Sequence, residues 1–423
     1  MYMRLVADGH DVRVAVSEPK AESTMRGLVP RAEDWRGELD WVRDARDEGI
    51  ILFEAVSEGF GGLQDGLRAD GFHVVGGSAF GDRLENDRAF AQELLAELGF
   101  PNGHVWEFEN AASASAHIRA RPRRYVVKYS GAGEGGDNFL GHLDDGADVL
   151  ALIQDQAGGE ARRFILMDFI EGIEVGVGAY FNGQYFLRPA CVDWEHKRFF
   201  AGDMGELTGE MGTVATFTDT DRLFAATLGK IEPLLAGRGH VGYVNLNTIV
   251  NEAGIWPLEF TCRFGYPGFA VLEALQRTSW GALLRQMVRG TAETIEVENG
   301  FSTGIVVTTP PFPYSRKQVH APIGLPVLLR GDWPEDERAH LHFGEVGIRN
   351  GHLVTAGLYG WTMVVTGTGA TVEASRDEAY RRCRQMVVPN GRYRLDIGAR
   401  TPGEIRRLAA LGLLPPVTNS CGH

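Results

Sequence analysis

Polar and apolar side chains alternate along residues 258–264, which read LEFTCRF. Glu259, Thr261 and Arg263 take every second position, and apolar or cysteine side chains take the positions between them. Because successive side chains of a strand point to opposite faces, this pattern predicts a strand with one apolar face and one polar face. An acid, a hydroxyl and a guanidinium on one face form a combination that can carry chemistry.

The preceding stretch, GYVNLNTIV at 242–250, predicts a second strand on which Asn245 and Asn247 share a face. The turn NEAG at 251–254 predicts that the two strands pair in antiparallel fashion. If the two polar faces coincide, these five polar side chains converge on one side of a sheet.

The rest of the chain predicts a multidomain protein of the α/β and α+β classes. Near the N-terminus, the apolar runs DVRVAV, GIILFEA and FHVVGG alternate with helical stretches, as in a parallel α/β sheet. Farther on, the NG pair at 182–183 predicts a hairpin between the strands IEVGVGAYF and GQYFLRPA, and one helix is expected over 270–288. The predicted domains are an N-terminal α/β domain at 1–85, a central domain at 86–300, a β-rich domain at 301–400, and a helix with a tail at 401–423.

Composition and charge exclude several classes of protein. The 423 residues are 44% hydrophobic and carry a formal net charge of -14, which argues against a general nucleic-acid binder. No apolar run reaches the roughly 18 residues of a membrane span, and no secretory signal precedes the first domain. The four cysteines are far apart, so we expect no disulfide framework, no zinc site and a cytoplasmic setting.

The paired strands predict a binding site for a cation and an anion. A carboxylate with neutral oxygen ligands suits Mg²⁺, so Glu259, Thr261 and Asn247 are the candidate metal ligands. Arg263 beside them suits a phosphate or a carboxylate, which its guanidinium can hold with two parallel hydrogen bonds. The alternative is a solvated outer face with a surface Glu–Arg pair.

Three further stretches offer polar groups, each with a plain structural alternative. Lys128 ends an apolar strand before the glycines of GAGEGG, which favours phosphate binding but is equally typical of a hairpin loop; those glycines are Gly131, Gly133 and Gly135. Glu174 begins a strand on which small glycines permit a flat ligand to approach, and a carboxylate there suits ribose hydroxyls. The stretch 195–213 reads either as a surface charge run or as a cover over an anionic substrate, with contacts from His196, Lys197, Arg198, Asp203 and Thr208.

Taken in order, these pieces resemble the ATP-grasp ligases, and specifically the phosphoribosylamine–glycine ligase family of purine synthesis. The resemblance covers about residues 72–398. Its motifs are VVGGSAFGDRLENDRAFAQELLAELGFP, YVVKYSGAGEGG, FIEGIEV, HKRFFAGDMGELTGEMG, LEFTCRFGYP, VVTGTGATVEASRDEAYRRC and YRLDIG. It implies an N-terminal pre-ATP-grasp domain, an ATP-grasp domain over 86–300 and a β-rich C-terminal domain.

The resemblance also implies roles for individual residues. Lys128 and Arg88 would contact ATP, the adenine would meet the backbone of Met167, Asp168, Phe169 and Ile170, and Glu174 would hold the ribose. Glu259 would bind Mg²⁺, with Mn²⁺ as an alternative ion, and Arg263 would neutralise developing phosphoryl charge. The reaction would join a small-molecule carboxylate to an amine through an acyl phosphate, by positioning and charge stabilisation. Neither nucleic acid nor membrane is an expected partner, and the oligomeric state stays open, with a monomer as one option.

Departures from the family pattern gather on the substrate side. Thr261 replaces the family asparagine, Tyr266 stands in GYPG where the family has GDPE, and Glu210 changes NTGGMG to LTGEMG. Glu134 stands near the place of a family lysine. The family begins with a strand and a glycine-rich loop that this chain lacks, so either its start lies upstream or that part of the substrate site is absent. We therefore expect a ligase with an altered acid or amine, and the alternative is a nucleotide-binding protein without ligase turnover.

Overall fold

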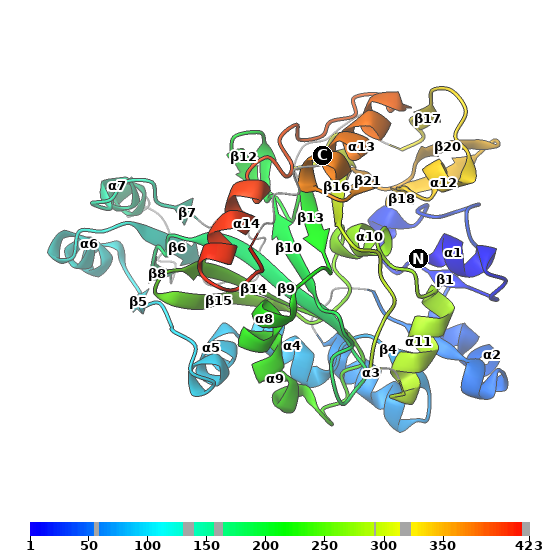
Figure 1. Ribbon diagram of the computed structural model, residues 1–423, viewed down its shortest axis with the longest axis horizontal. Helices are drawn as coiled ribbons and strands as arrows, with labels where there is room; N and C mark the ends of the chain where they lie inside the picture. Colours follow the sequence, from blue (N-terminus) through cyan, green and yellow to red (C-terminus); the bar gives the residue numbers. More distant parts are fainter. Residues whose placement is uncertain (55–58, 130–138, 156–163, 292, 314–322, 417–423) are drawn as a thin grey trace. The chain divides into compact units, whose positions relative to one another are not determined.

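A computed structural model describes residues 1–54, 59–129, 139–155, 164–291, 293–313 and 323–416 (Figure 1). The chain divides into two compact units. The first unit contains Met1–Leu94, Glu174–Thr248 and Leu258–His423, and the second contains Leu95–Ile173 and Ile249–Pro257. The domain boundaries proposed from the sequence at 85, 300 and 400 stay predictions.

The largest sheet has the strand order β15-β14-β9-β10-β13-β16-β21-β18, and most of its residues belong to the first unit. The strand pairs from β9 to β18 in this order are all antiparallel. Its strands come from both sides of residue 300, so the C-terminal residues share a sheet with the central ones. The strands are β9 (Ile173–Phe181), β10 (Cys191–Glu195), β13 (Gly212–Thr216), β14 (Gly242–Asn251), β15 (Gly254–Thr261), β16 (Phe301–Thr308), β18 (Leu341–Phe343) and β21 (Trp361–Gly369).

Helices cover both faces of this sheet, which is why its middle strands are apolar on both sides. A Cβ atom added at Gly304 of β16 would meet Val271 of α10 (Gly268–Glu273). A Cβ atom added at Gly367 of β21 would meet the backbone of α13 (Val372–Gln385). Gly304 pairs with Thr366 and Thr303 pairs with Gly367, so the two helices lie on opposite faces of β16 and β21 (Figure 1).

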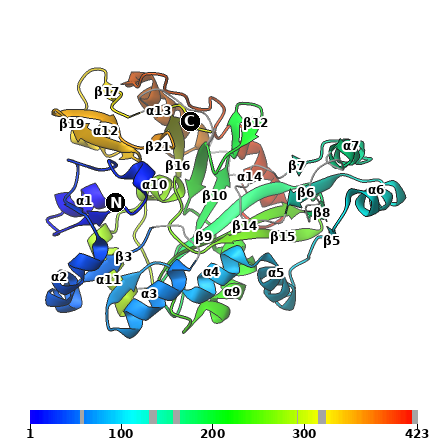
Figure 2. The same cartoon turned by 180° about the vertical axis from the view of Figure 1, so that it is seen from behind.

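The N-terminal part of the first unit has two short parallel sheets, which confirms the predicted parallel α/β pattern. β1 (Val14–Ala15) pairs with β2 (Arg31–Ala32), and β3 (Ile50–Leu52) pairs with β4 (His73–Val75). Helices α3 and α4 lie side by side, and α3 packs against β4 (Figure 2). The helices of this region are α1 (Tyr2–Ala7), α2 (Leu39–Asp44), α3 (Phe60–Ala69), α4 (Ala79–Asn86) and α5 (Arg88–Glu97), the last of which continues into the second unit.

The second unit is a four-stranded antiparallel sheet of order β5-β8-β6-β7 with two helices. Its core joins Ile118 and Ile153 of the helices to Val127 and Leu166 of the strands. The elements are β5 (Val105–Phe108), α6 (Ala111–Ala120), β6 (Tyr125–Tyr129), β7 (Phe139–Leu140), α7 (Ala147–Asp155) and β8 (Phe164–Asp168).

Two predictions about local structure were wrong. The chain turns back at the predicted NG pair, where Phe181 bridges Phe186, but residues 183–190 form only isolated bridges and no strand. Backbone N–H groups there donate to the side chains of Asn182 and Glu232 instead of to a ladder. The helix expected over 270–288 is two helices, since Ser279 caps a new one with its hydroxyl.

The remaining elements are short. Among the described residues, no helix is long and apolar enough to cross a membrane. These elements are β11 (Arg198–Phe200), β12 (Met204–Leu207), α8 (Asp221–Ala226), α9 (Leu228–Leu235), α11 (Trp280–Arg289), β17 (Leu328–Leu329), α12 (Glu335–Arg338), β19 (Val346–Arg349), β20 (His352–Thr355), β22 (Met386–Val387), α14 (Thr401–Ala410) and the 3-10 turns Pro19–Ala21, Trp35–Glu38 and Arg46–Glu48.

Candidate functional site

The polar face of β15 and the residues after it line a cavity of about 1630 Å³ within the first unit. Glu259, Thr261 and Arg263 all contribute to the cavity wall. Phe260 and Cys262, which alternate with them, are buried. The alternation predicted from the sequence is confirmed, and the polar face is the wall of a cavity.

A lysine connects the carboxylates of this wall. The ammonium of Lys197 lies 3.0 Å from Glu174 Oε1, 3.2 Å from Glu195 Oε2 and 3.1 Å from Glu259 Oε1. Burial would lower the pKa of Lys197, but the three carboxylates outweigh burial and raise it well above its ordinary value. Asn247 Nδ2 donates to Glu174 Oε1 at 2.9 Å, so the predicted asparagine face reaches the same group of side chains.

Arg263 is hydrogen-bonded to Glu85 of α4, whereas the alternative predicted from the sequence was a Glu–Arg pair on the protein surface. Arg263 Nε donates to Glu85 Oε1 at 2.9 Å, and the other oxygen of Glu85 accepts the backbone N–H of Cys262. Burial lowers the pKa of Arg88, and the charge of Glu259 opposes that shift. Arg88 of α5 is therefore close enough to feel the charge of Glu259, and Arg263 is held by Glu85 of α4.

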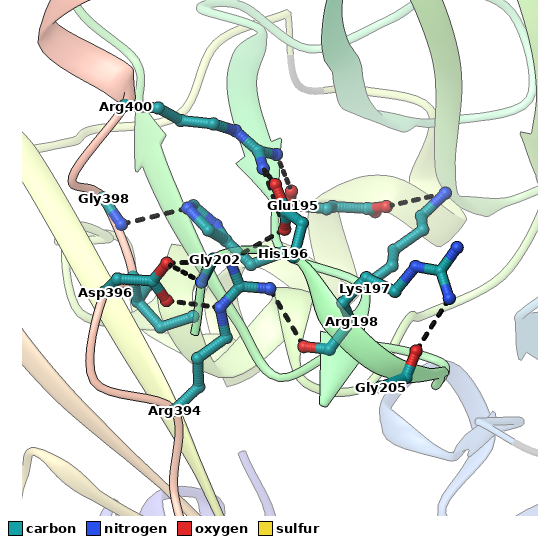
Figure 3. Close-up of polar contacts among 12 residues, drawn as sticks. Glu195, His196, Lys197, Arg198, Gly202, Gly205, Arg394, Asp396, Gly398 and Arg400 are labelled. Atoms are coloured by element: carbon teal, nitrogen blue, oxygen red, sulfur yellow. Dashed lines mark hydrogen bonds and ion pairs between the residues drawn. The ribbon is translucent and has the colours of Figure 1, made fainter. Parts of the chain in front are cut away.

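The loop of β11 and β12 is tied to the chain segment before α14 (Figure 3). Arg394 donates to Asp203 Oδ1 at 2.8 Å and to the Arg198 carbonyl at 2.9 Å, and Arg400 reaches Asp203 Oδ2 at 3.1 Å. The backbone N–H of Gly202 donates to Asp396 at 2.9 Å. The motif YRLDIG was recognised in the sequence, but a role for Arg394 was not predicted, because its partner Asp203 lies 191 residues away along the chain.

His196, Arg198 and Thr208 make internal contacts. His196 is buried, its Nε2 accepts the N–H of Gly398 at 3.1 Å, and burial together with Arg400 and Arg394 lowers its pKa to about 3. Arg198 donates to the Gly205 carbonyl at 2.7 Å, and Thr208 Oγ1 donates to the Lys197 carbonyl at 2.7 Å. Substrate contact by these three side chains stays a prediction.

Tyr266 lies on the wall of the same cavity. Its ring stacks on Trp361, with centroids 5.6 Å apart and an interplanar angle of 30°. Its hydroxyl is buried without a hydrogen-bond partner among the described residues. An aromatic pair thus stands where the sequence comparison expects carboxylates.

The candidate adenine and phosphate residues belong to the second unit. Lys128 on β6 stands opposite Ile165 of β8, and β8 ends with Met167 and Asp168. Burial would raise the pKa of Asp168, but hydrogen bonds from Arg123 and His104 outweigh it and lower the pKa. Phe169 lies 3.5 Å below the Arg124 guanidinium, and Ile170 follows it. Gly131, Gly133 and Gly135 lie outside the described residues.

Two buried acids in the same cavity were not predicted as site residues. Asp193 Oδ2 accepts a hydrogen bond from Asn245 at 2.7 Å, and burial with the nearby Glu195 raises the pKa of Asp193 to about 8. Glu210 is also buried, and burial together with Glu195 and Asp193 raises its pKa well above the ordinary value. The sequence contained one indication of this acid, because Glu210 stands in the substrate loop where the family pattern has a glycine.

We expect Glu210→Gln to stabilise the protein, by about 1–3 kcal/mol at pH 8, because glutamine has no proton to lose whereas burial disfavours ionisation of Glu210 in the folded state. Below the ordinary pKa of a glutamate the carboxyl is protonated in both folded and unfolded states and the gain vanishes. As the pH rises toward the raised folded-state pKa, only the unfolded state releases the proton easily, so the difference from wild type grows. Urea unfolding of both proteins between pH 5 and pH 8.5 measures it, and a gain independent of pH would contradict this account.

The oxygen atoms on the cavity wall suit a hard cation that also binds ligands from outside the protein. Among the described residues, no three His, Cys, Asp or Glu side chains are arranged to hold a metal ion. Glu259 and Thr261 share the cavity wall, and the amide nitrogen of Asn247 is used by Glu174, which leaves its oxygen as the acceptor. One carboxylate with neutral oxygens fits Mg²⁺ whose other ligands are phosphate oxygens and water.

Comparisons with known proteins identify relatives of this chain. A family model described as the phosphoribosylglycinamide synthetase, ATP-grasp (A) domain, matches residues 86–269. A phosphoribosylamine–glycine ligase of Rhizobium meliloti is 30% identical over 354 residues, which are 80% of this chain and 80% of that protein. A Brucella melitensis protein of the same description is 27% identical over 350 residues, with the same coverage of 80% of each chain.

The fold has a counterpart among solved structures. The crystal structure of a phosphoribosylamine–glycine ligase from Thermotoga maritima matches with a TM-score of 0.67 and 21% identity, and the match covers 93% of this chain and 96% of that one. At this identity the match shows the fold, including the multidomain α/β architecture expected from the sequence.

Proposed function

We propose, since the chain belongs to the phosphoribosylamine–glycine ligase family, that it is an ATP- and Mg²⁺-dependent ligase that joins a carboxylic acid to an amine. The observation that carries the proposal is the wall of β15, where Glu259, Thr261 and Arg263 share one cavity with Lys197. A carboxylate, neutral oxygens and cationic side chains in one cavity suit phosphoryl transfer, which depends on positioning and charge stabilisation.

The nucleotide contacts would follow the residues that match the family pattern. In the proposal, Lys128 contacts the phosphates, and Glu174 accepts hydrogen bonds from the ribose hydroxyls. The adenine contacts the backbone of Met167, Asp168, Phe169 and Ile170. Arg88 lies beside Glu259 and would face the phosphates as well. The glycines Gly131, Gly133 and Gly135 remain candidates for the phosphate loop.

The reaction would proceed in two displacements. A carboxylate oxygen of the acid attacks the γ-phosphorus of ATP, the bond to the bridging oxygen breaks, and ADP leaves. The amine nitrogen then attacks the acyl carbon, phosphate leaves with the bonding electrons, and the nitrogen gives up a proton. Mg²⁺, held by Glu259, Thr261 and Asn247, would supply positive charge at the phosphate oxygens.

Arg263 would stabilise charge on the transferring phosphoryl group. Its Nε is fixed by Glu85 at 2.9 Å, so the terminal nitrogens of the guanidinium can point along the cavity wall that they share. An oriented guanidinium needs little reorganisation when charge develops, which is the basis of electrostatic catalysis.

The substrates would differ from those of the relatives. Tyr266 and Glu210, both on the cavity wall, replace residues of the family pattern in the substrate region. A changed ring and a changed charge alter which acid or amine fits. The purine-pathway pair of glycine and phosphoribosylamine is one member of this class.

The test is ADP release by the purified protein from Mg-ATP. Glycine with phosphoribosylamine formed in place is compared with panels of other acids and amines. Release that needs both an acid and an amine supports the ligase, and the pair that gives it identifies the substrates. ATP binding without any substrate-dependent release would contradict the proposal and favour a nucleotide-binding protein. One observation favours that second candidate, because Lys197 already lies against the carboxylate proposed to hold the metal.

We expect Tyr266→Asp to change the substrate preference, because it replaces a stacked ring on the cavity wall with a carboxylate. The ratio of kcat/KM for two amines should shift about tenfold or more, as one charge-assisted contact is gained or lost. Tyr266→Phe is the matched control, which keeps the stacking on Trp361 and should leave the ratio unchanged. Equal preference in the aspartate variant and the wild type would count against a role for Tyr266.

A further inference from the structure

Three buried oxygen atoms on the cavity wall have no hydrogen-bond partner among the described residues. They are Asp193 Oδ1, Glu210 Oε1 and Thr213 Oγ1, on side chains that are 6%, 8% and 2% exposed. All three residues line the cavity that Glu259 and Arg263 also line. Buried oxygens are normally satisfied, so three of them in one cavity indicate a missing donor.

The strand register places Asp193 and Thr213 on one face of the sheet, and Glu210 is near enough to Asp193 for their charges to interact. Asp193 and Glu195 are two residues apart and therefore share that face, and Glu195 stands directly opposite Thr213 of β13. On the other side Asp193 pairs with Gly176, where a Cβ would come within 2.3 Å of Asp193 Oδ1. The absence of a side chain at Gly176 leaves room for the Asp193 carboxylate.

Among the described residues, no cation forms an ion pair with these two carboxyl groups. The ion pairs of Lys197 go to Glu174, Glu195 and Glu259, and its charge acts on Asp193 and Glu210 only from farther away. Asp193 receives only a neutral hydrogen bond, from Asn245. A buried carboxylate is strongly disfavoured unless a positive group pairs with it, so the Asp193–Glu210 end of the cavity is complementary to a cation.

We infer that Asp193, Glu210 and Thr213 bind the protonated nitrogen of an organic cation, which in the proposed ligase is a second positive charge on the amine substrate. An ammonium group has three N–H donors and no acceptor, which matches three oxygen acceptors. The inference rests on the proposed function only in making that cation a substrate. A cavity of about 1630 Å³ has room for a molecule rather than a bare ion.

The chemistry of the reaction selects a diamine or a basic amino compound. The nitrogen that attacks the acyl phosphate must be neutral, whereas the nitrogen held by two carboxylates must keep its proton. One molecule can meet both demands only if it carries two separate basic nitrogens. An anionic phosphosugar amine would bring its phosphate toward the two carboxylates, which is unfavourable.

The test uses 1,4-diaminobutane and 1-aminobutane, which differ by one charged nitrogen. Calorimetric titration of the full chain with Mg-ADP present measures binding of each, and ADP release from Mg-ATP with the acid panel measures turnover. We expect the diamine to bind at least about tenfold more tightly, because a charge-assisted contact is gained. Asp193→Asn and Glu210→Gln should each remove most of that preference, and Glu335→Gln, an exposed acid on the cavity rim, should keep it.

Each outcome decides between the alternatives. Equal binding of both probes, or a preference that survives in both variants, would overturn the cation site whatever the ligase assay shows. Binding of Mg²⁺ alone at this site, lost in the two variants, would overturn it in favour of a metal. Selective diamine binding without ADP release would keep the cation site and contradict the ligase. Circular dichroism of the variants checks the fold, and both substitutions preserve the shape of the side chain.

Discussion

Replacing Glu259 with glutamine is expected to lower the rate of ADP release by about 100-fold or more while the fold stays intact. Glutamine keeps the size of the side chain but removes the one carboxylate among the three proposed metal ligands. The same change removes the negative charge that faces Lys197 at 3.1 Å and Arg88 beyond it. Loss of a preorganised charge at a phosphoryl-transfer site typically costs this much in rate.

Steady-state kinetics with saturating Mg-ATP, and a titration of Mg²⁺ at fixed ATP, measure the effect. A weaker response to Mg²⁺ together with a lower kcat separates a metal ligand from a structural residue. Glu252→Gln, in the short connection between β14 and β15, is the matched control and should behave as the wild type. Wild-type turnover in Glu259→Gln would remove the central assignment of the proposed mechanism.

Lys197→Met is expected to lower the free energy of unfolding by about 2–3 kcal/mol at pH 8. The substitution leaves Glu174, Glu195 and Glu259 close together without their shared cation. Breaking a fully buried ion pair costs about 3–5 kcal/mol, and the effect here is smaller because a quarter of the Lys197 side chain is exposed.

Two conditions should restore part of the lost stability. Burial raises the pKa of Glu195, so this carboxylate takes up a proton as the pH falls and the repulsion decreases; the difference from wild type should therefore shrink from pH 8 to pH 5. Mg²⁺ at about 10 mM should stabilise the variant more than the wild type, since the cation binds the folded state at the vacated position. Urea unfolding measures both effects, with Lys20→Met as an exposed control. If the loss in the free energy of unfolding depends on neither pH nor Mg²⁺, Lys197 stabilises the fold by packing alone.

The sequence by itself determined the chemistry of the central strand. Alternation at Glu259, Thr261 and Arg263 requires no knowledge of the fold, because a two-residue period assigns faces directly. The parallel N-terminal pattern and the α/β architecture followed from periodicity in the same way. The chain turns back at 182–183 as predicted, since Phe181 bridges Phe186. The strand expected after the turn was wrong because backbone N–H groups there donate to Asn182 Oδ1 instead of to a ladder, which periodicity does not detect.

Only the tertiary structure decided which groups meet. Lys197 reaches carboxylates 23 and 62 residues away, and Arg394 reaches Asp203 across 191 residues. Asp193 and Glu210 look like ordinary strand and loop acids in the sequence, and their raised pKa values come from burial in the folded chain. Burial and charge pairing depend on neighbours brought together by the sheet, whereas alternation is local. The sequence therefore specified a polar face, and the fold decided that this face lines a cavity rich in carboxylates with few cations.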